Sequence, residues 1–161
     1  MNKIGDTLFH FGANEEIVSA FVVGGVEFVI IGGLAVAWYC PDRQADDMDL
    51  LVNPTHENSI RISRALDGLH ICGFTPTSFA KPGVQAPLKQ LHYAELLTPQ
   101  KNGPTYVEVA AGAIDAKVFN IPVRLASVAS LIQMKEQAVV SAETQREKHL
   151  SDIECLREHA V

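Results

Sequence analysis

The pattern of apolar and polar residues in the first third of the chain predicts a helix, a buried strand, a short helix and a second strand. These elements cover residues 14–23, 27–31, 34–39 and 47–52. Asn14 is a good capping residue, and Glu15 and Glu16 place acids in the first turn of the first helix. That helix ends at Gly24-Gly25, and the first strand ends at Gly32-Gly33.

The remaining chain predicts further helices and strands in a less regular pattern. Helices are expected at 54–69, from 127 onward and at 144–158, and a short strand is expected at 121–123. Residues 73–87 are rich in Pro and Gly and predict a loop, with or without one short strand. Residues 88–97 and 105–111 look like paired strands, because Asn102-Gly103 between them is a turn dipeptide. The expected fold class is α+β, a mixed sheet flanked by helices, as one domain over 1–161.

Asp47 and Asp49 lie on one face of the predicted strand 47–52, because side chains alternate across a strand. At about 3.3 Å of rise per residue, their stems are about 6–7 Å apart. Both carboxylates can then reach one or two hard cations, which take oxygen ligands. Without a cation the two charges would repel and raise each other's pKa. The alternative interpretation is an edge strand with a solvated acidic face.

Gly32 and Gly33 add a second chemical feature next to this strand. Glycine lets the backbone turn sharply and lets a phosphate approach the main chain closely. The helix that follows offers free N–H groups and a positive dipole end to an anion. The sequence therefore places a phosphate cradle and a pair of carboxylates on adjacent elements.

Residues 29–52 resemble the signature of the DNA polymerase beta-type nucleotidyltransferase superfamily: apolar strand, Gly-Gly or Gly-Ser, short helix, Asp-apolar-Asp. The segment is similar to the small bacterial branch of abortive-infection and toxin–antitoxin nucleotidyltransferases, whose loop reads Arg-x-Thr-x-Asp-apolar-Asp-Leu. Arg43 matches that loop, whereas Ala45 replaces the threonine. Residues 146–152 are similar to the family's Arg-x-Lys-Asp-x-x-Asp. His149 stands at its first Asp, which would make contacts of that position sensitive to pH.

The resemblance implies transfer of a nucleoside monophosphate from an NTP to an acceptor, with release of pyrophosphate. Asp47 and Asp49 would bind Mg²⁺ or Mn²⁺, and Glu108 would be the third acid. Glu108 lies in Val-Glu-Val-Ala where the family has apolar-Asp-apolar-apolar, and an edge carboxylate in solvent is its alternative interpretation. Asp115, in an expected turn after Gly112, is the competitor for the same role.

The resemblance also implies a nucleotide-binding set of two glycines and two cations. Gly32 and Gly33 would present backbone N–H groups to the terminal phosphates, and Arg43 and Lys135 would neutralise phosphate charge. Lys135 ends the stretch Leu-Ile-Gln-Met-Lys, which resembles the family's Leu-Ile-x-x-Lys. The alternative for this lysine is a solvated residue at a helix edge.

Composition and charge indicate which binding partners the protein is suited to and in which compartment it works. The net charge of −6 disfavours RNA without excluding it, because nucleic-acid binders usually show a basic surface. Cys40, Cys72 and Cys155 fit neither a disulfide framework nor a zinc site, and indicate reduced thiols in a cytoplasm. Residues 21–40 are apolar, but four glycines and Glu27 interrupt them, so we expect no membrane span.

The sequence leaves the acceptor open among RNA such as tRNA ends, a protein, and a small molecule such as an antibiotic. A chain of this size has little room for acceptor recognition, which predicts a homodimer, a partner protein or a small acceptor. The alternative from another functional class is a module that keeps the fold without catalysis and acts by nucleotide or protein binding. Ala45, Glu108 and His149 are the departures from the family pattern that favour it.

Overall fold

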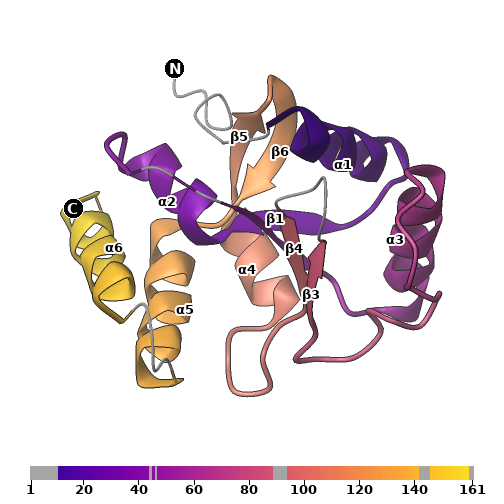
Figure 1. The fold of residues 1–161 in the computed structure, drawn as a ribbon. Coiled ribbons are helices and arrows are strands. Elements are labelled where there is room, and N and C mark those ends of the chain that lie inside the picture. The colour runs from indigo at the N-terminus through magenta and orange to yellow at the C-terminus, as the bar shows by residue number, and fades with distance from the viewer. Residues whose placement is uncertain (1–10, 44, 46, 89–93, 142–145, 160–161) are drawn as a thin grey trace.

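The computed structural model describes residues 11–43, 45, 47–88, 94–141 and 146–159 (Figure 1). In this described part, six strands form one mixed sheet in the order β3-β4-β2-β1-β6-β5, and six helices accompany it. The strands are β1 (Phe28–Ile31), β2 (Met48–Val52), β3 (Gln85–Leu88), β4 (Ala94–Leu97), β5 (Ile114–Val118) and β6 (Ile121–Leu125). The helices are α1 (Phe11–Val23), α2 (Gly32–Tyr39), α3 (His56–Gly68), α4 (Tyr106–Gly112), α5 (Val128–Ser141) and α6 (Arg146–His159). The expected α+β fold class is confirmed.

The two strands at the centre of the sheet are those with the most continuous apolar sequence. Every residue of β1 is buried, and in β2 only Asp49 is partly exposed. Strands covered on both faces by helices need such unbroken apolar runs. β1 pairs antiparallel with β2, which places Ile31 opposite Asp49, and β2 pairs parallel with β4, which places Asp49 opposite Glu95. Asp49 and Glu95 therefore lie side by side at the end of the sheet where β1 ends at Ile31.

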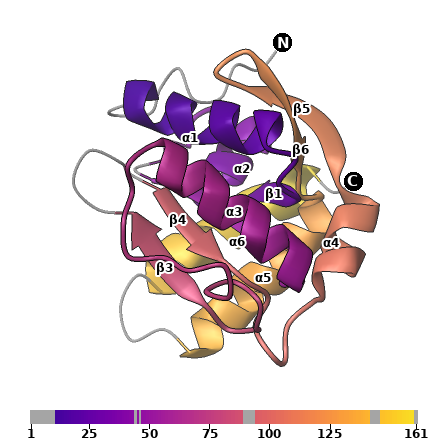
Figure 2. The same cartoon turned by 90° about the vertical axis from the view of Figure 1, so that its right-hand side faces the viewer.

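The helices form a layer on each face of the sheet. Figure 1 shows α1 and α3 on one side and α2, α5 and α6 on the other, and the turned view of Figure 2 agrees. Ile17, Val18 and Phe21 of α1 are fully buried, and the Phe21 ring meets Phe28 of β1 edge-on with centroids 5.8 Å apart. Among the described residues, no helix combines the length and the apolar character that a membrane span requires.

The predicted strand over 105–111 is wrong, because this segment forms helix α4. Thr105 is its N-cap: the Glu108 N–H donates to Thr105 Oγ1 at 3.2 Å, and the Thr105 N–H donates to Glu108 Oε1 at 3.3 Å. Such a reciprocal capping box stabilises a helix start. The buried side chains of α4, Tyr106 and Val109, are three residues apart, which is helical rather than strand spacing.

The strand β4 therefore pairs with β3 and β2 instead of with 105–111. Residues 89–93, in the predicted strand 88–97, lie outside the described residues, as does the predicted helix start at Thr144. The expected turn around Asp115 is the edge strand β5, where Asp115 is exposed and pairs with Arg124 at 2.6 Å. The strand at 121–123 and the helix after Ser127 are confirmed, as β6 and α5.

Candidate active site

Two neighbouring strands build the acidic centre of the candidate site. Asp49 of β2 and Glu95 of β4 are register partners, so their side chains emerge side by side on one face of the sheet. Burial, followed by the charges of Glu95 and Asp47, raises the pKa of Asp49 to about 7. Burial and the charge of Asp47 also raise the pKa of Glu95. Asp47, exposed just before β2, thus adds negative potential to a pair that already resists ionisation.

Gly32 faces Asp49 from the end of β1. Its φ of +71° lies in the left-handed region that favours glycine, and a Cβ there would stand 2.9 Å from Asp49 Cγ. Helix α2 begins at this point, and its N-cap Ile31 makes no side-chain capping hydrogen bond. The first N–H groups of a helix have no partner within the helix, so at this end of α2 they can bind water or an anion, next to the carboxylate of Asp49.

The acidic pair and the glycine corner open into a cleft of about 600 Å³. The loop after β4 forms one wall of this cleft, and α5 and α6 form another, with Lys135 and His149 lining it. Apolar residues such as Leu97 and Met134 line the walls together with the polar residues Gln100 and Gln137. A ligand with both an apolar part and a charged part fits such a lining.

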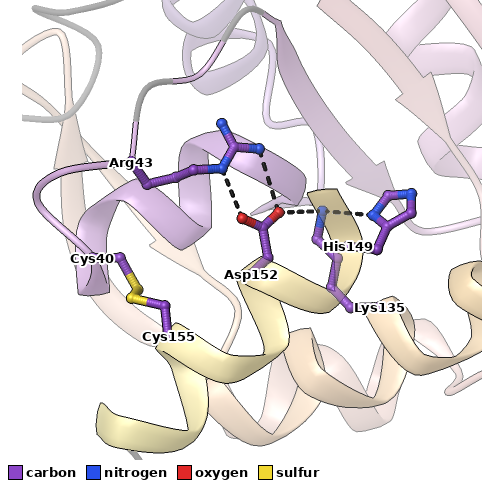
Figure 3. Close-up of polar contacts among 6 residues, drawn as sticks. All are labelled: Cys40, Arg43, Lys135, His149, Asp152 and Cys155. Carbon is purple, nitrogen blue, oxygen red and sulfur yellow. Dashed lines mark hydrogen bonds and ion pairs between the residues drawn. A yellow bond between two sulfur atoms is a disulfide. The ribbon is translucent and has the colours of Figure 1, made fainter. Parts of the chain in front are cut away.

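Two predicted phosphate-binding cations meet at one buried carboxylate, Asp152 of α6 (Figure 3). Arg43 donates from Nε to Asp152 Oδ1 at 2.7 Å and from Nη2 to Oδ2 at 3.3 Å, and Lys135 Nζ lies 3.1 Å from Oδ2. Burial would raise the pKa of Asp152, but Arg43 and Lys135 overcome this effect and hold it below its usual range. Lys135 is only 9% exposed, so the interpretation of a solvated surface lysine is wrong.

The Cys40–Cys155 disulfide joins the end of α2 to α6, one turn from Asp152 (Figure 3). The sequence-based expectation of reduced thiols is therefore wrong for these two residues, whereas Cys72 is a free, exposed cysteine. The spacing of the cysteines gave no sign of this pairing, because 115 residues separate them. The bond ties the helix that starts at the glycine corner to the helix that carries Asp152.

Reducing this disulfide should lower the free energy of unfolding by about 2–4 kcal/mol, because the bond restricts the unfolded chain over a long loop. Urea titrations of the native protein with and without reductant measure the loss. The double variant Cys40→Ala/Cys155→Ala should resemble the reduced protein and lose its response to reductant. Cys72→Ala is the matched control and should behave like the native chain. Equal stability with and without reductant would contradict the disulfide.

A ready-made metal cage is absent: among the described residues, no three His, Cys, Asp or Glu side chains gather closely enough to hold an ion. Mg²⁺, however, is commonly bound by one or two carboxylates together with substrate phosphates. Asp49 and Glu95 fit that kind of site, because burial and then neighbouring negative charge raise the pKa of each carboxyl, and a bound cation would favour the ionised forms.

No family model matches the sequence, and no curated protein matches it. Solved structures do resemble the fold. An antigenic nucleotidyltransferase-like protein from Paracoccidioides brasiliensis has a TM-score of 0.56 at 15% identity, over 89% of this chain and 76% of that one. ANT(2'')-Ia in complex with adenylyl-2''-tobramycin has a TM-score of 0.61 at 16% identity, over 92% and 87% of the two chains.

This chain has the nucleotidyltransferase fold. The solution structure of the antibiotic-resistance factor ANT(2'')-Ia agrees, with a TM-score of 0.64 at 15% identity over 93% of this chain and 83% of that one. These likenesses describe the fold, and the assignment to the toxin–antitoxin branch stays a prediction.

Within the nucleotidyltransferase fold, most of the predicted site residues come together and one does not. Asp49, Gly32 and Lys135 line the same cleft, and Asp47 is close enough to act on the pKa of Asp49. Arg43 lies against Gly33, where a Cβ would stand 2.9 Å from Arg43 Nη2.

Glu108 is the predicted site residue that lies elsewhere, because its carboxylate caps α4. Glu95 is the acid that sequence reasoning missed. The alternation in Ala94-Glu95-Leu96-Leu97, with Ala94 and Leu96 buried and Glu95 between them, is the signal that marks it.

Proposed function

We propose that this protein is a nucleotidyltransferase that moves a nucleoside monophosphate from an NTP to an acceptor hydroxyl and releases pyrophosphate. The observation that carries the proposal is the register pairing of Asp49 with Glu95, opposite Gly32 at the open start of α2. Lys135 lines the same cleft, so carboxylates, backbone donors and a cation face one space. Phosphoryl transfer depends on this combination of positioning and charge stabilisation.

The chain's own groups have distinct roles in this proposal. The N–H groups that begin α2 at Gly32 and Gly33 hold the terminal phosphates, because glycine permits their close approach. Lys135 neutralises phosphate charge in the cleft, and Arg43 adds positive potential at Gly33. The amphipathic cleft walls orient the base and sugar.

Asp49 and Glu95 would hold a divalent cation, Mg²⁺ or Mn²⁺, with Asp47 joining when the triphosphate is present. Such an ion neutralises the phosphates and lowers the pKa of an acceptor hydroxyl. Glu95 thus takes the place that the sequence analysis gave to Glu108, since Glu95 is the acid beside Asp49. Asp115 is no longer a competitor, because it is exposed and paired on the edge strand β5.

Incubation of the protein with labelled NTPs, Mg²⁺ or Mn²⁺, and a panel of acceptors tests the proposal. The panel contains bulk tRNA, cell-extract protein and aminoglycosides, the last because ANT(2'')-Ia was solved with adenylyl-2''-tobramycin. Label on any acceptor, with pyrophosphate release, supports transfer. Metal-dependent nucleotide binding without label on any acceptor supports the catalytically degenerate module instead. One observation favours this second function: Asp152 contacts both Arg43 and Lys135, so the two cations proposed to act on phosphate already have a carboxylate partner.

Glu95→Gln should lower the transfer rate by about 10²-fold, because it removes one charge from the acidic pair. Glu108→Gln is the matched control: it weakens the capping box of α4 by about 1 kcal/mol and should leave the transfer rate unchanged. Initial rates of both variants at saturating metal measure the difference. If Glu108→Gln lost activity and Glu95→Gln kept it, the assignment of the third acid would be wrong.

A further inference from the structure

His149 of α6 lines the candidate cleft and lies beside the cation predicted to bind phosphate. Its Nδ1 is 3.3 Å from Lys135 Nζ, as Figure 3 shows. The other partner of that ammonium is Asp152, 3.1 Å away. Because a lysine ammonium only donates hydrogen bonds, His149 Nδ1 accepts. The imidazole is then neutral in the ligand-free protein, with its proton on Nε2.

Charged groups face the His149 ring from α5, from its own helix, from the loop before β2 and from the strands across the cleft. They are Lys135, Lys148, Asp152, Arg43, Asp49 and Glu95. Burial, followed by the charge of Lys135, lowers the pKa of His149, and Lys148 and Arg43 act in the same direction. Asp152 opposes them. The ring is therefore held neutral mainly by burial and by a neighbouring cation that a polyanion would attract.

We propose that His149 becomes a further phosphate-binding group of this cleft and takes up one proton from solvent when a triphosphate binds. The inference rests on the proposed function, since it requires polyphosphate in the cleft. A triphosphate draws the Lys135 ammonium toward its own oxygens, which removes the hydrogen bond that occupies Nδ1. The same negative charge favours the imidazolium. The added proton resides on Nδ1, and both ring nitrogens can then donate to phosphate oxygens.

This proton uptake would compensate for a shortage of positive charge in the site. Asp152 engages both Arg43 and Lys135, so one buried carboxylate offsets part of the charge of two cations. Asp49, Glu95 and Asp47 add further negative charge near the phosphates. A side chain that is neutral in the empty cleft and cationic in the filled one supplies positive charge only when it is needed. Histidine is the residue whose pKa permits this near neutral pH.

Nuclear magnetic resonance on the histidine-labelled protein tests the inference. The chain has six histidines, and the His149 signal is the one missing from His149→Gln. The pKa of that imidazole is measured in the free protein, with inorganic tripolyphosphate, and with MgATP. We expect the pKa of His149 to rise by at least about one pH unit with either ligand. The signal of His56, exposed at the start of α3 on the other side of the sheet, should not move when either ligand is added.

His149→Gln provides a second readout, because its amide oxygen can still accept from Lys135 while its charge stays fixed. Native affinity for tripolyphosphate should exceed that of His149→Gln by up to about tenfold near pH 6.5 and converge with it above pH 8. His56→Gln should behave like the native protein. Binding with an unchanged pKa of His149 would overturn the inference and leave the proposed function standing. Failure of both tripolyphosphate and MgATP to bind would overturn both.

Discussion

Asp49→Asn should reduce nucleotide transfer on the order of 10³-fold while it makes the metal-free protein more stable above neutral pH. The activity is lost because Asp49 is the carboxylate nearest the glycine corner and a register partner of Glu95. The amide that replaces it carries no charge for a divalent cation. Initial transfer rates and metal-dependent nucleotide binding measure this loss.

The gain in stability follows from the pKa of Asp49, which burial and the charges of Glu95 and Asp47 raise to about 7 in the folded protein. The unfolded carboxyl ionises near pH 4. Between about pH 4 and pH 7 the folded state therefore holds more protons than the unfolded state, so the native protein loses stability as pH rises through this window. The Asn variant escapes that loss. Because its amide must still be desolvated, we expect a gain on the order of 2 kcal/mol at pH 8.

Urea titrations of the native protein and Asp49→Asn at pH 4.5 and pH 8, without divalent metal, separate the two states of the carboxyl. The stability difference should be small at pH 4.5 and large at pH 8. Added Mg²⁺ with nucleotide should stabilise the native protein and leave the variant unchanged. A variant that is less stable than the native protein at pH 8 would contradict the conclusion that burial and neighbouring negative charge make the ionised Asp49 carboxylate destabilising in the folded protein.

Asp152→Ala should lower the free energy of unfolding by about 3–5 kcal/mol, because it removes the carboxylate of a buried ion pair and leaves the cations in place. Asp152 is 2% exposed, and both Arg43 and Lys135 contact it. Its pKa is held below the usual range, so its contribution is present above the unfolded pKa and disappears as pH falls through the folded one. Urea titration at pH 7 and at pH 3 measures both effects.

Asp115→Ala is the matched control, since Asp115 also pairs with an arginine, at 2.6 Å, but lies in solvent with its side chain 92% exposed. An exposed ion pair of this kind contributes only about 0–1 kcal/mol. The contrast between the two aspartates separates the effect of burial from that of charge pairing. Similar losses in both variants would show that burial of Asp152 adds nothing.

The part of the site that could be predicted from the sequence is local in the chain. The first strand, the glycine corner, the short helix and the second strand follow one another between residues 27 and 52, and the structure has them in that order. The alternation of side chains along the second strand places the Asp49 side chain on the face of the sheet where Gly32 lies. Lys135 was found by its resemblance to the family's lysine. Its burial against Asp152 could not be predicted from the sequence pattern, because the contact joins residues of two different helices.

The part that could not be predicted depends on a non-local pairing. Glu95 becomes a neighbour of Asp49 only because β4 pairs parallel with β2, and parallel partners are joined by long crossovers whose register no short motif reveals. The segment that carries Glu108 was predicted as a strand for a different reason. Thr105 and Glu108 have the spacing of a capping box, but the alternation of apolar residues was given more weight than that local signal.

The parallel pairing of β2 with β4 also determines how this chain can change over evolutionary time. The connection between them carries α3 and β3, and the acidic pair depends on where that connection ends rather than on how long it is. Insertions between these elements are therefore compatible with an intact pair and offer a route to a remodelled outer surface. Deletion of a single residue inside β4 has the opposite effect. It turns Glu95 toward the opposite side of the sheet, where α1 and α3 lie, and leaves Asp49 alone at the glycine corner.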